Sequence, residues 1–297
     1  MNDIERQGCQ VRTDGDGVVY AFWHDNDHGT PVQFMARSFD GGVKFERPRI
    51  VAHVTDVGQF DLVRSIANDG IAGARTNSFP NVDIANGAPT GTGAPNTIVL
   101  NWTDASNGLN SEEALTQLST DGGESRTDPV NVAEASDRPN FPAVALSPDG
   151  HDLWVTYDAF LDPFREDTTS TRRFQGVFRH ADLDPSDGSL SNLTTLERGG
   201  IGDARASSAN GLIDEFIGDY NFVAATNDFG AAVYNDARNA EVCGDTDMDP
   251  DTPEINSYRQ AIANGEEPEA PAPGTDCPAT FGNTDIFSAT AADPSAP

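Results

Sequence analysis

Arginines recur at corresponding places along the chain, each shortly before an apolar, strand-like run. They are Arg6, Arg75, Arg138 and Arg205, in a chain with only 18 Lys and Arg residues. A guanidinium group binds a carboxylate through two parallel hydrogen bonds, so arginines that meet at one place would hold an acidic ligand. Asp137 and Asp203 lie beside two of them, and ion pairs between strands are the alternative use of these arginines.

A second candidate for chemistry is the acidic run GDTDMDPDTPE, which begins at residue 244. Its alternating carboxylates include Asp245, Asp247 and Asp249, and such oxygen-rich loops suit Ca²⁺. The EF-hand pattern is not met, because Pro250 stands where that loop requires glycine. A solvated acidic loop is the alternative. The five histidines show no paired spacing of the kind that binds zinc, so the sequence predicts no zinc site.

Cysteines bracket the same part of the chain. Cys243 and Cys277 flank a polar, Pro-rich excursion between two strand-like segments, and we expect a disulfide to close it. Two unpaired thiols are the alternative. A disulfide would place the protein in an oxidising compartment, secreted or at the cell surface. Cys9 lies in a strand-like position, where we expect a small buried side chain.

Charge excludes two classes of partner. The chain has 297 residues, a formal net charge of −30 and a pI near 4.1. Such an acidic surface repels nucleic acid and anionic membranes. The chain also has no apolar run near the roughly 20 residues of a spanning helix, so we expect no membrane insertion. Its first residues, MNDIERQGCQ, lack the basic and apolar regions of a signal peptide.

An internal repeat organises the chain. Four times an alternating strand, a tight turn and a second strand with an aromatic residue lead to an aspartate, and a third strand candidate follows. The four aspartates are Asp25, Asp104, Asp158 and Asp236. Helical periodicity is confined to a short segment at 257–265. Radial repetition of such antiparallel units predicts an all-β fold, a β-propeller.

The turn after the third strand carries a family resemblance. Ser38, Asp40, Gly42 and Phe45 in SFDGGVKF match the Asp box (BNR repeat) of the sialidase, or neuraminidase, superfamily of bacterial type. Ser119, Asp121 and Gly123 match its first three positions, although Arg126 replaces the aromatic residue. SPDGHDLW at 147–154 is similar, but the repeat places it in the hairpin between first and second strands. Glycine suits the turn and Ser and Asp can bind its backbone, so we assign the boxes a structural role.

The resemblance implies a six-bladed, sialidase-like propeller. About four repeat units are visible in this chain, which is therefore expected to be part of a longer propeller or a reduced relative. We expect residues 1–297 to form a single propeller domain, with 243–277 as a Cys-flanked loop insertion.

The resemblance also implies site residues. Arg75, Arg138 and Arg205, with Asp219, would bind the carboxylate of an acidic sugar. Tyr220 activated by Glu215 would be the nucleophile, although Tyr220 also fits a core aromatic at the start of its strand. Asp61 would be the acid, and Asp56 in the same loop is an equal candidate. The function implied is an exo-acting, sialidase-type glycosidase that needs no cofactor. A non-catalytic secreted propeller that binds a glycan or a protein is the alternative.

Overall fold

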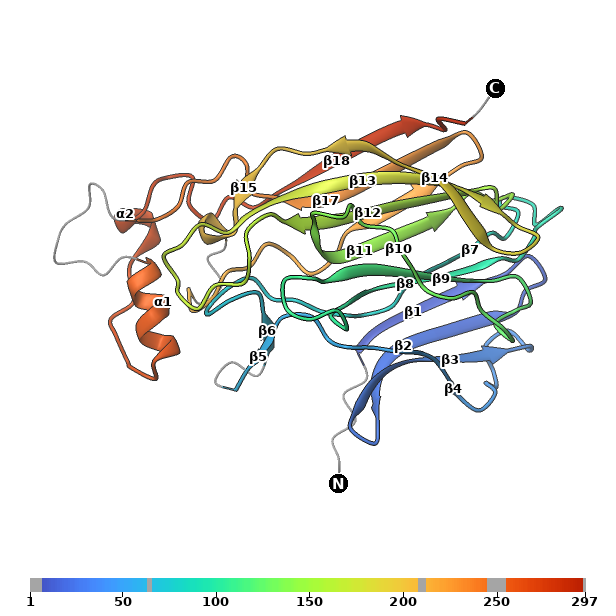
Figure 1. Cartoon of the computed structure of the whole chain (residues 1–297), viewed down its shortest axis with the longest axis horizontal. Coiled ribbons are helices and arrows are strands. Elements are labelled where there is room, and N and C mark those ends of the chain that lie inside the picture. The colour runs from blue at the N-terminus through green and yellow to red at the C-terminus, as the bar shows by residue number, and fades with distance from the viewer. Residues whose placement is uncertain (1–6, 63–65, 208–211, 245–254, 296–297) are drawn as a thin grey trace.

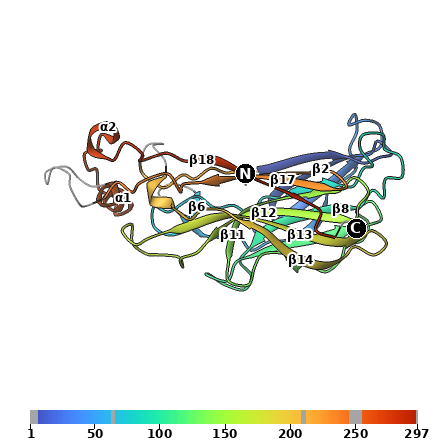
Figure 2. The same cartoon turned by 90° about the horizontal axis from the view of Figure 1, so that it is seen from above.

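The computed structural model describes residues 7–62, 66–207, 212–244 and 255–295. The chain forms successive antiparallel sheets, which follow one another from β1–β4 to β16–β18 (Figure 1). The two α-helices lie together at one end of the sheets, as the view from above also shows (Figure 2).

The first two sheets each have four strands that follow the chain from the inside outward. The first contains β1 (Gln7–Thr13), β2 (Val19–Asp27), β3 (Thr30–Ser38) and β4 (Arg49–His53). The second contains β7 (Asn81–Ile84), β8 (Ile98–Asp104), β9 (Glu113–Ser119) and β10 (Val130–Asn131). The strands β5 (Gln59–Asp61) and β6 (Ile66–Asn68) form a small separate ribbon between them in sequence.

The third and fourth sheets repeat the order. The third contains β11 (Arg138–Leu146), β12 (Asp152–Phe160), β13 (Arg173–Asp184) and β14 (Ser189–Arg198), and β15 (Gly202–Asp203) also pairs with β13. The fourth contains β16 (Phe222–Ala225), β17 (Phe229–Asp236) and β18 (Asp285–Ala292). The third strands that we expected in all four units are therefore present as β3, β9, β13 and β18.

The first strands of the four sheets lie side by side. The side chain of Asn81 in β7 accepts a hydrogen bond from the backbone N–H of Val144 in β11 at 3.0 Å. Asn221, just before β16, donates to the carbonyl oxygen of Phe141 in β11 at 3.0 Å. At the other end, Gly8 in β1 abuts Phe79, just before β7. Sheets arrayed around neighbouring inner strands make the protein β-propeller-like, with four larger sheets and the β5–β6 ribbon in the described residues.

Apolar side chains fill the space between neighbouring sheets. Phe22, Met35, Ile98 and Trp102 belong to one buried cluster between the first two sheets. Another buried cluster joins residues of β8 and β9 to the third sheet, among them Leu153 and Tyr157.

The third and fourth sheets fit together through reciprocal glycine contacts. A side chain on Gly176 in β13 would clash with the Tyr234 ring of β17, with its Cβ 2.0 Å from the ring. A side chain on Gly230 in β17 would clash equally with Trp154 of β12, at 2.2 Å. Each sheet thus offers an aromatic ring to a glycine of the other.

The turns that carry the family resemblance are built from side-chain hydrogen bonds. Ser38 Oγ donates to Asp40 at 2.8 Å and accepts from the Gly42 N–H at 2.9 Å. Gly42 has a φ of 89°, which disfavours any other residue. Phe45 is 39% exposed, so the aromatic residue of this turn is not buried between sheets. These contacts support the structural role of the turn.

The second such turn repeats the same pattern. Ser119 Oγ donates to Asp121 at 2.9 Å and accepts from the Gly123 N–H at 2.8 Å. Gly123 packs closely against Met35 of the first sheet, where a Cβ would lie 2.6 Å from its methyl carbon. Arg126 lines a small cavity between the first two sheets beside Met35. The similar SPDG segment lies in the β11–β12 hairpin, as the repeat predicted.

The disulfide between Cys243 and Cys277 is present and closes the excursion after β17. Helix α1 (Ile255–Ala263) lies inside it, close to the predicted helical segment, and α2 (Pro273–Asp276) precedes Cys277. The candidate calcium ligands Asp245, Asp247 and Asp249 lie outside the described residues.

Cys9 is exposed on β1 as a free thiol, so the expectation of a buried side chain is wrong. It faces the space between the inner strands, described below. Within the described ranges, no helix combines the length and the apolar character required to cross a membrane.

Candidate functional site at the inner strands

A cavity of about 260 Å³ lies where the four inner strands meet. Cys9, Phe79, Phe141 and Tyr220, one from the start of each repeat, all line it. Two of the strands are irregular here: the pairing register shifts between Gln7 and Gln10 in β1 and between Asn140 and Ala143 in β11. Phe141 has a φ of 49°, an unusual conformation for an aromatic residue. Such bulges often redirect side chains next to binding sites.

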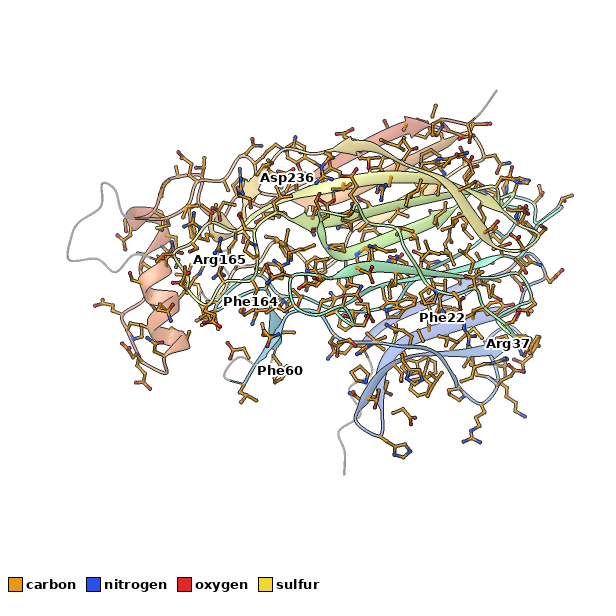
Figure 3. The ribbon with its side chains drawn as sticks, viewed as in Figure 1. Phe22, Arg37, Phe60, Phe164, Arg165 and Asp236 are labelled. Atoms are coloured by element: carbon orange, nitrogen blue, oxygen red, sulfur yellow. A yellow bond between two sulfur atoms is a disulfide. The ribbon has the colours of Figure 1, made fainter. Side chains whose placement is uncertain are left out.

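A larger cavity of about 650 Å³ adjoins the first. The two share Asn77, Phe79, Asp219 and Tyr220 in their walls. The remaining wall comes from the end of β2, from the loop after β4, from the β5–β6 ribbon and from the segment before β7. Phe60 of that ribbon lies at the edge of the molecule (Figure 3) and also lines the cavity. We refer to the two together as the axial cavity.

Arg75, Asp219 and Tyr220 lie together in the axial cavity, as three of the predicted site residues. The Arg75 guanidinium donates a hydrogen bond to the Asp219 carboxylate and lies 4.9 Å from the centre of the Phe216 ring. Burial raises the pKa of Asp219, although the charge of Arg75 acts in the opposite direction. Tyr220 is 58% exposed, so it is not the buried core aromatic of the alternative interpretation.

His24 and Asp56 form a second polar group on the larger cavity. The Nε2 atom of His24 lies 3.4 Å from the Asp56 carboxylate, and its Nδ1 atom is buried without a hydrogen-bond partner among the described residues. Asp56 lines the cavity, whereas Asp61 on β5 does not. The structure thus favours Asp56 over Asp61 as a residue of the cavity, whereas the sequence offered both as equal candidates for the acid. Sequence reasoning missed His24, although it directly precedes the aspartate that recurs in every repeat.

Arg138 lies elsewhere, in a buried ion-pair network. Its guanidinium bonds Glu112 at 2.9 Å, Asp69 and the carbonyl oxygen of Asp162. Burial favours the neutral acid, but the hydrogen bonds and charge of Arg138 hold the pKa of Glu112 below its usual value. Arg138 does not line the axial cavity. Its donors are directed at these partners.

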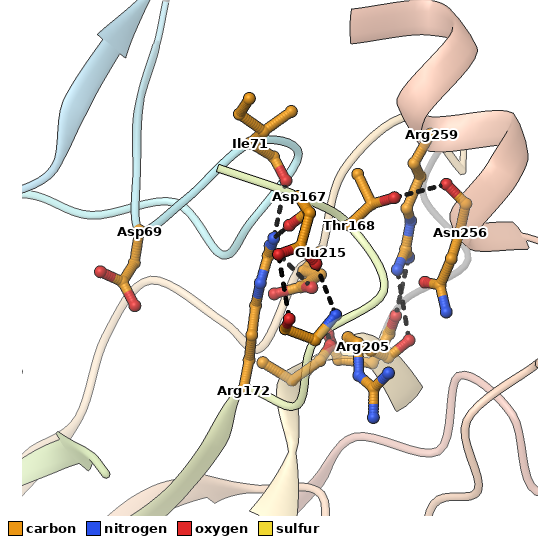
Figure 4. A network of polar contacts seen from close by, with 12 residues as sticks. Asp69, Ile71, Asp167, Thr168, Arg172, Arg205, Glu215, Asn256 and Arg259 are labelled. Atoms are coloured by element: carbon orange, nitrogen blue, oxygen red, sulfur yellow. Dashed lines mark hydrogen bonds and ion pairs between the residues drawn. The ribbon is translucent and has the colours of Figure 1, made fainter. Parts of the chain in front are cut away.

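Glu215 and Arg205 belong to a further buried network beside α1 (Figure 4). Glu215 is 1% exposed and pairs with Arg172 at 3.0 Å. Arg205 pairs with Asp203, next to the one-turn helix η1 (Ala204–Ala206). Burial raises the pKa of Glu215 against the opposing charges of Arg172 and Arg259.

The same network anchors α1. Arg259 donates to the carbonyl oxygens of Arg205 at 3.2 Å and of Ser207 at 3.3 Å, and Thr168 donates to the carbonyl oxygen of Asn256 at 2.7 Å (Figure 4). Glu215 lines neither part of the axial cavity, so the structure does not bring it together with Tyr220. Nor does it bring Arg138 and Arg205 to Arg75. Arg6 lies outside the described residues.

The residues that line the axial cavity determine which ligands it can bind. Aromatic rings of Phe60, Phe79 and Tyr220 offer flat apolar surface, and Asp56, Asp219 and Asn77 offer hydrogen-bond acceptors and an amide. Ligand sites combine apolar walls with a few convergent polar groups in this way. The volume is within the range of small-molecule sites.

Comparisons with known proteins give remote structural similarities. No family model matches the chain, and no curated protein does. Among solved structures, a Hadza microbial sialidase has 13% identity over 77% of this chain, with a TM-score of 0.42. A GH93 α-L-arabinofuranosidase of Fusarium graminearum has 17% identity over 73% of this chain, with a TM-score of 0.41. An α-L-arabinanase of Penicillium chrysogenum has 13% identity over 75%, with a TM-score of 0.43. The chain spans 41%, 53% and 57% of these three structures, respectively.

Proposed function

We propose that the protein binds carbohydrate in the axial cavity. The observation that carries this proposal is one continuous wall on which Tyr220, Phe79 and Phe60 stand beside Asp56 and Asp219. A sugar ring has an apolar face and a hydroxyl-bearing edge. The rings would cover the apolar face, and the carboxylates would accept hydrogen bonds from the hydroxyl groups.

The charges of the cavity favour a neutral sugar. Arg75 is the one arginine among the described residues that line it, and it already binds Asp219. Asp56 adds a second carboxylate. A carboxylated sugar would have to displace Asp219 from Arg75 and would approach Asp56. The acidic sugar implied by the family resemblance remains a prediction, and it is the competing outcome of the same experiment.

Binding can be tested by saturation-transfer NMR and calorimetry with a panel of sugars. The panel pairs neutral pentoses and hexoses, with their short oligosaccharides, against sialic acid and glucuronic acid. We expect binding of a neutral sugar and a loss of at least tenfold in affinity for Tyr220→Ala. Phe39→Ala is the matched control, because Phe39 is similarly exposed, at 63%, but lies outside the cavity. Binding that survives Tyr220→Ala would contradict the site.

A second candidate function is glycoside hydrolysis. It is favoured by Asp56, Asp219 and Tyr220 on the same cavity, because hydrolysis of a glycosidic bond requires a proton donor and a second group that acts on the anomeric carbon. The raised pKa of Asp219 suits the proton donor. Tyr220 would be the nucleophile in the sialidase-type variant of this proposal.

Turnover can be measured by fluorophore release from a panel of aryl glycosides that includes a sialoside and an arabinofuranoside. We expect Asp219→Asn to lower kcat at least a hundredfold, with a loss of no more than about tenfold in sugar affinity. Tyr220→Phe removes only the hydroxyl. A loss of turnover with sugar binding retained would show that Tyr220 acts as the nucleophile and not only by stacking. No turnover of any glycoside, with sugar binding intact, would leave the protein a binding module.

A further inference from the structure

Far from the axial cavity, four ligand-type side chains converge where the third and fourth sheets meet. Asp152 begins β12, His180 and Asp182 lie two residues apart in β13, and Asp293 directly follows β18. Each offers one nitrogen or oxygen atom, and these four atoms all lie within 4.8 Å of one another. The cluster thus combines residues separated by more than a hundred positions in the sequence.

The strand register forces three of these groups together. Asp152 pairs directly with Asp182 across β12 and β13, so two carboxylates stand opposite each other. His180 lies on the same face of β13 as Asp182, since side chains two residues apart share a face. Like charges in directly opposed positions destabilise a sheet unless something compensates them.

The described residues supply little compensation. No Lys or Arg among them forms an ion pair with Asp152, Asp182 or Asp293. Asp152 is 4% exposed, so water does not screen it well. Ser295 shares its hydroxyl between Asp182 and Asp293, at 2.8 Å from each. Asn192 also donates to Asp182 at 2.6 Å, and the Ser295 N–H donates to Asp293 at 2.8 Å. These donors are neutral, so they do not cancel the charge of three carboxylates.

His180 points to a missing ligand independently of the acids. Its side chain is 1% exposed, and Nε2 is hydrogen-bonded to Asp152 at 2.9 Å and lies 3.6 Å from Asp293. Nδ1 has no hydrogen-bond partner among the described residues and lies 3.9 Å from the Asp182 carboxylate. That separation is too long for a hydrogen bond. It matches two ligand atoms of one ion, which lie roughly 3–4.5 Å apart when each bond is about 2.0–2.3 Å.

We propose that Asp152, His180, Asp182 and Asp293 bind a divalent transition metal ion, Zn²⁺ or Mn²⁺. One imidazole with three carboxylates suits these metals, because both accept nitrogen and oxygen ligands, whereas Ca²⁺ and Mg²⁺ take oxygen. The ion would replace the repulsion between the acids with shared coordination. It would also fasten the segment after β18 to the third sheet.

The test is metal binding by the untagged full-length chain after chelation and dialysis. Zn²⁺, Mn²⁺, Ca²⁺ and Mg²⁺ are each titrated in a calorimeter, and the melting temperature is followed with and without each ion. The Zn²⁺ titration uses a Cys9→Ser background, because the exposed thiol of Cys9 could bind zinc by itself. We expect one equivalent of Zn²⁺ or Mn²⁺ and a rise of several degrees in melting temperature.

Asp293→Asn and Asp182→Asn test the ligands without touching the buried His180. We expect each to weaken metal affinity at least tenfold and to abolish the thermal shift. Asp184→Asn is the matched control, two residues further along β13 and outside the cluster, and it should bind as wild type. Binding of Ca²⁺ alone, binding unchanged by Asp293→Asn, or no binding of any ion would each overturn the proposal.

Discussion

The axial cavity and the buried networks around Arg138 and Glu215 are made of the same residue types. In each, arginine meets carboxylate near the start of an inner strand. They differ in what surrounds the pair: Arg75 and Asp219 line open space, whereas Arg138 and Glu215 are almost fully enclosed. An enclosed pair must satisfy every charge from within the protein, while a pair on a cavity retains donors and acceptors for a ligand. Residue type and spacing alone therefore do not mark a site.

The largest effect should come from removing a buried cation. Arg138→Met leaves Asp69 and Glu112 buried without their partner, and we expect a loss of about 3–5 kcal/mol in the free energy of unfolding. Urea denaturation measures it. If Arg138→Met lowered the free energy of unfolding no more than a typical surface substitution does, the buried network would not differ from the cavity in the way described.

The disulfide gives the next test, because it closes the excursion that carries Arg259. Replacing Cys243 and Cys277 by serine should lower the free energy of unfolding by about 2–4 kcal/mol through the entropy of the open loop. Sugar binding at the axial cavity should persist under native conditions, since the excursion lies beside the Glu215 network. Cys9→Ser is the control and should leave stability unchanged. A loss of sugar binding in the double variant at a temperature where it stays folded would show that the two regions are coupled.

Asp158 represents a third situation, a buried acid without an arginine. Burial raises its pKa to about 8, against the effect of neighbouring Asn221 and Asn235. The folded state therefore holds a proton that the unfolded state has lost, between about pH 4 and pH 8, and stability falls as pH rises through this window. Asp158→Asn should remove this slope, so its stability relative to wild type should be about 4 kcal/mol more favourable at pH 8.5 than at pH 5.

Thermal melts across pH would check the Asp158 prediction. The control is Asp149→Asn, a partly exposed position, and this variant should retain the slope. Equal slopes for wild type and Asp158→Asn would show that Asp158 is ionised in the folded protein throughout.

The smallest change in stability is expected at the cavity itself. Arg75→Met removes a half-exposed ion pair, which contributes less than about 1 kcal/mol. The same variant should reduce sugar affinity about tenfold, because Asp219 loses the group that orients it. Calorimetry and urea denaturation on one sample separate the two effects. If Arg75→Met instead caused a large loss of stability and left sugar affinity unchanged, Arg75 would belong to a structural ion pair and not to a binding site.

The repeat made the sheets predictable, because the alternating strands and glycine turns are local signals. The third strands, the disulfide and the helix near 257–265 all follow from such signals. Whether the arginines converge on one site was harder to predict from the sequence. Arg75, Arg138 and Arg205 share a sequence context but take different partners. Their partners, Asp219, Asp69 and Asp203, lie 144, 69 and 2 residues away in the chain. Only the folded chain decides which acid is near.

His180 shows the same limit from another direction. In a sequence, a metal site is recognisable from ligands that lie a few residues apart, such as a pair of histidines. Of the three acids around His180, Asp182 is close in sequence, but Asp152 comes from β12 and Asp293 from the segment after β18. Strand register assembles them, and register is a property of the whole sheet.

The two glycine contacts between β13 and β17 and between β12 and β17 have a consequence for folding. Gly176 accepts the Tyr234 ring, and Gly230 accepts the Trp154 ring, so each aromatic residue needs one particular backbone position opposite it. If the fourth sheet docked two residues out of line, Asp228 or Ala232 would face Trp154, and a Cβ would occupy the space of the indole. The two contacts therefore disfavour misaligned docking of the fourth sheet. Because β18 pairs with β17, its position is set together with that of β17.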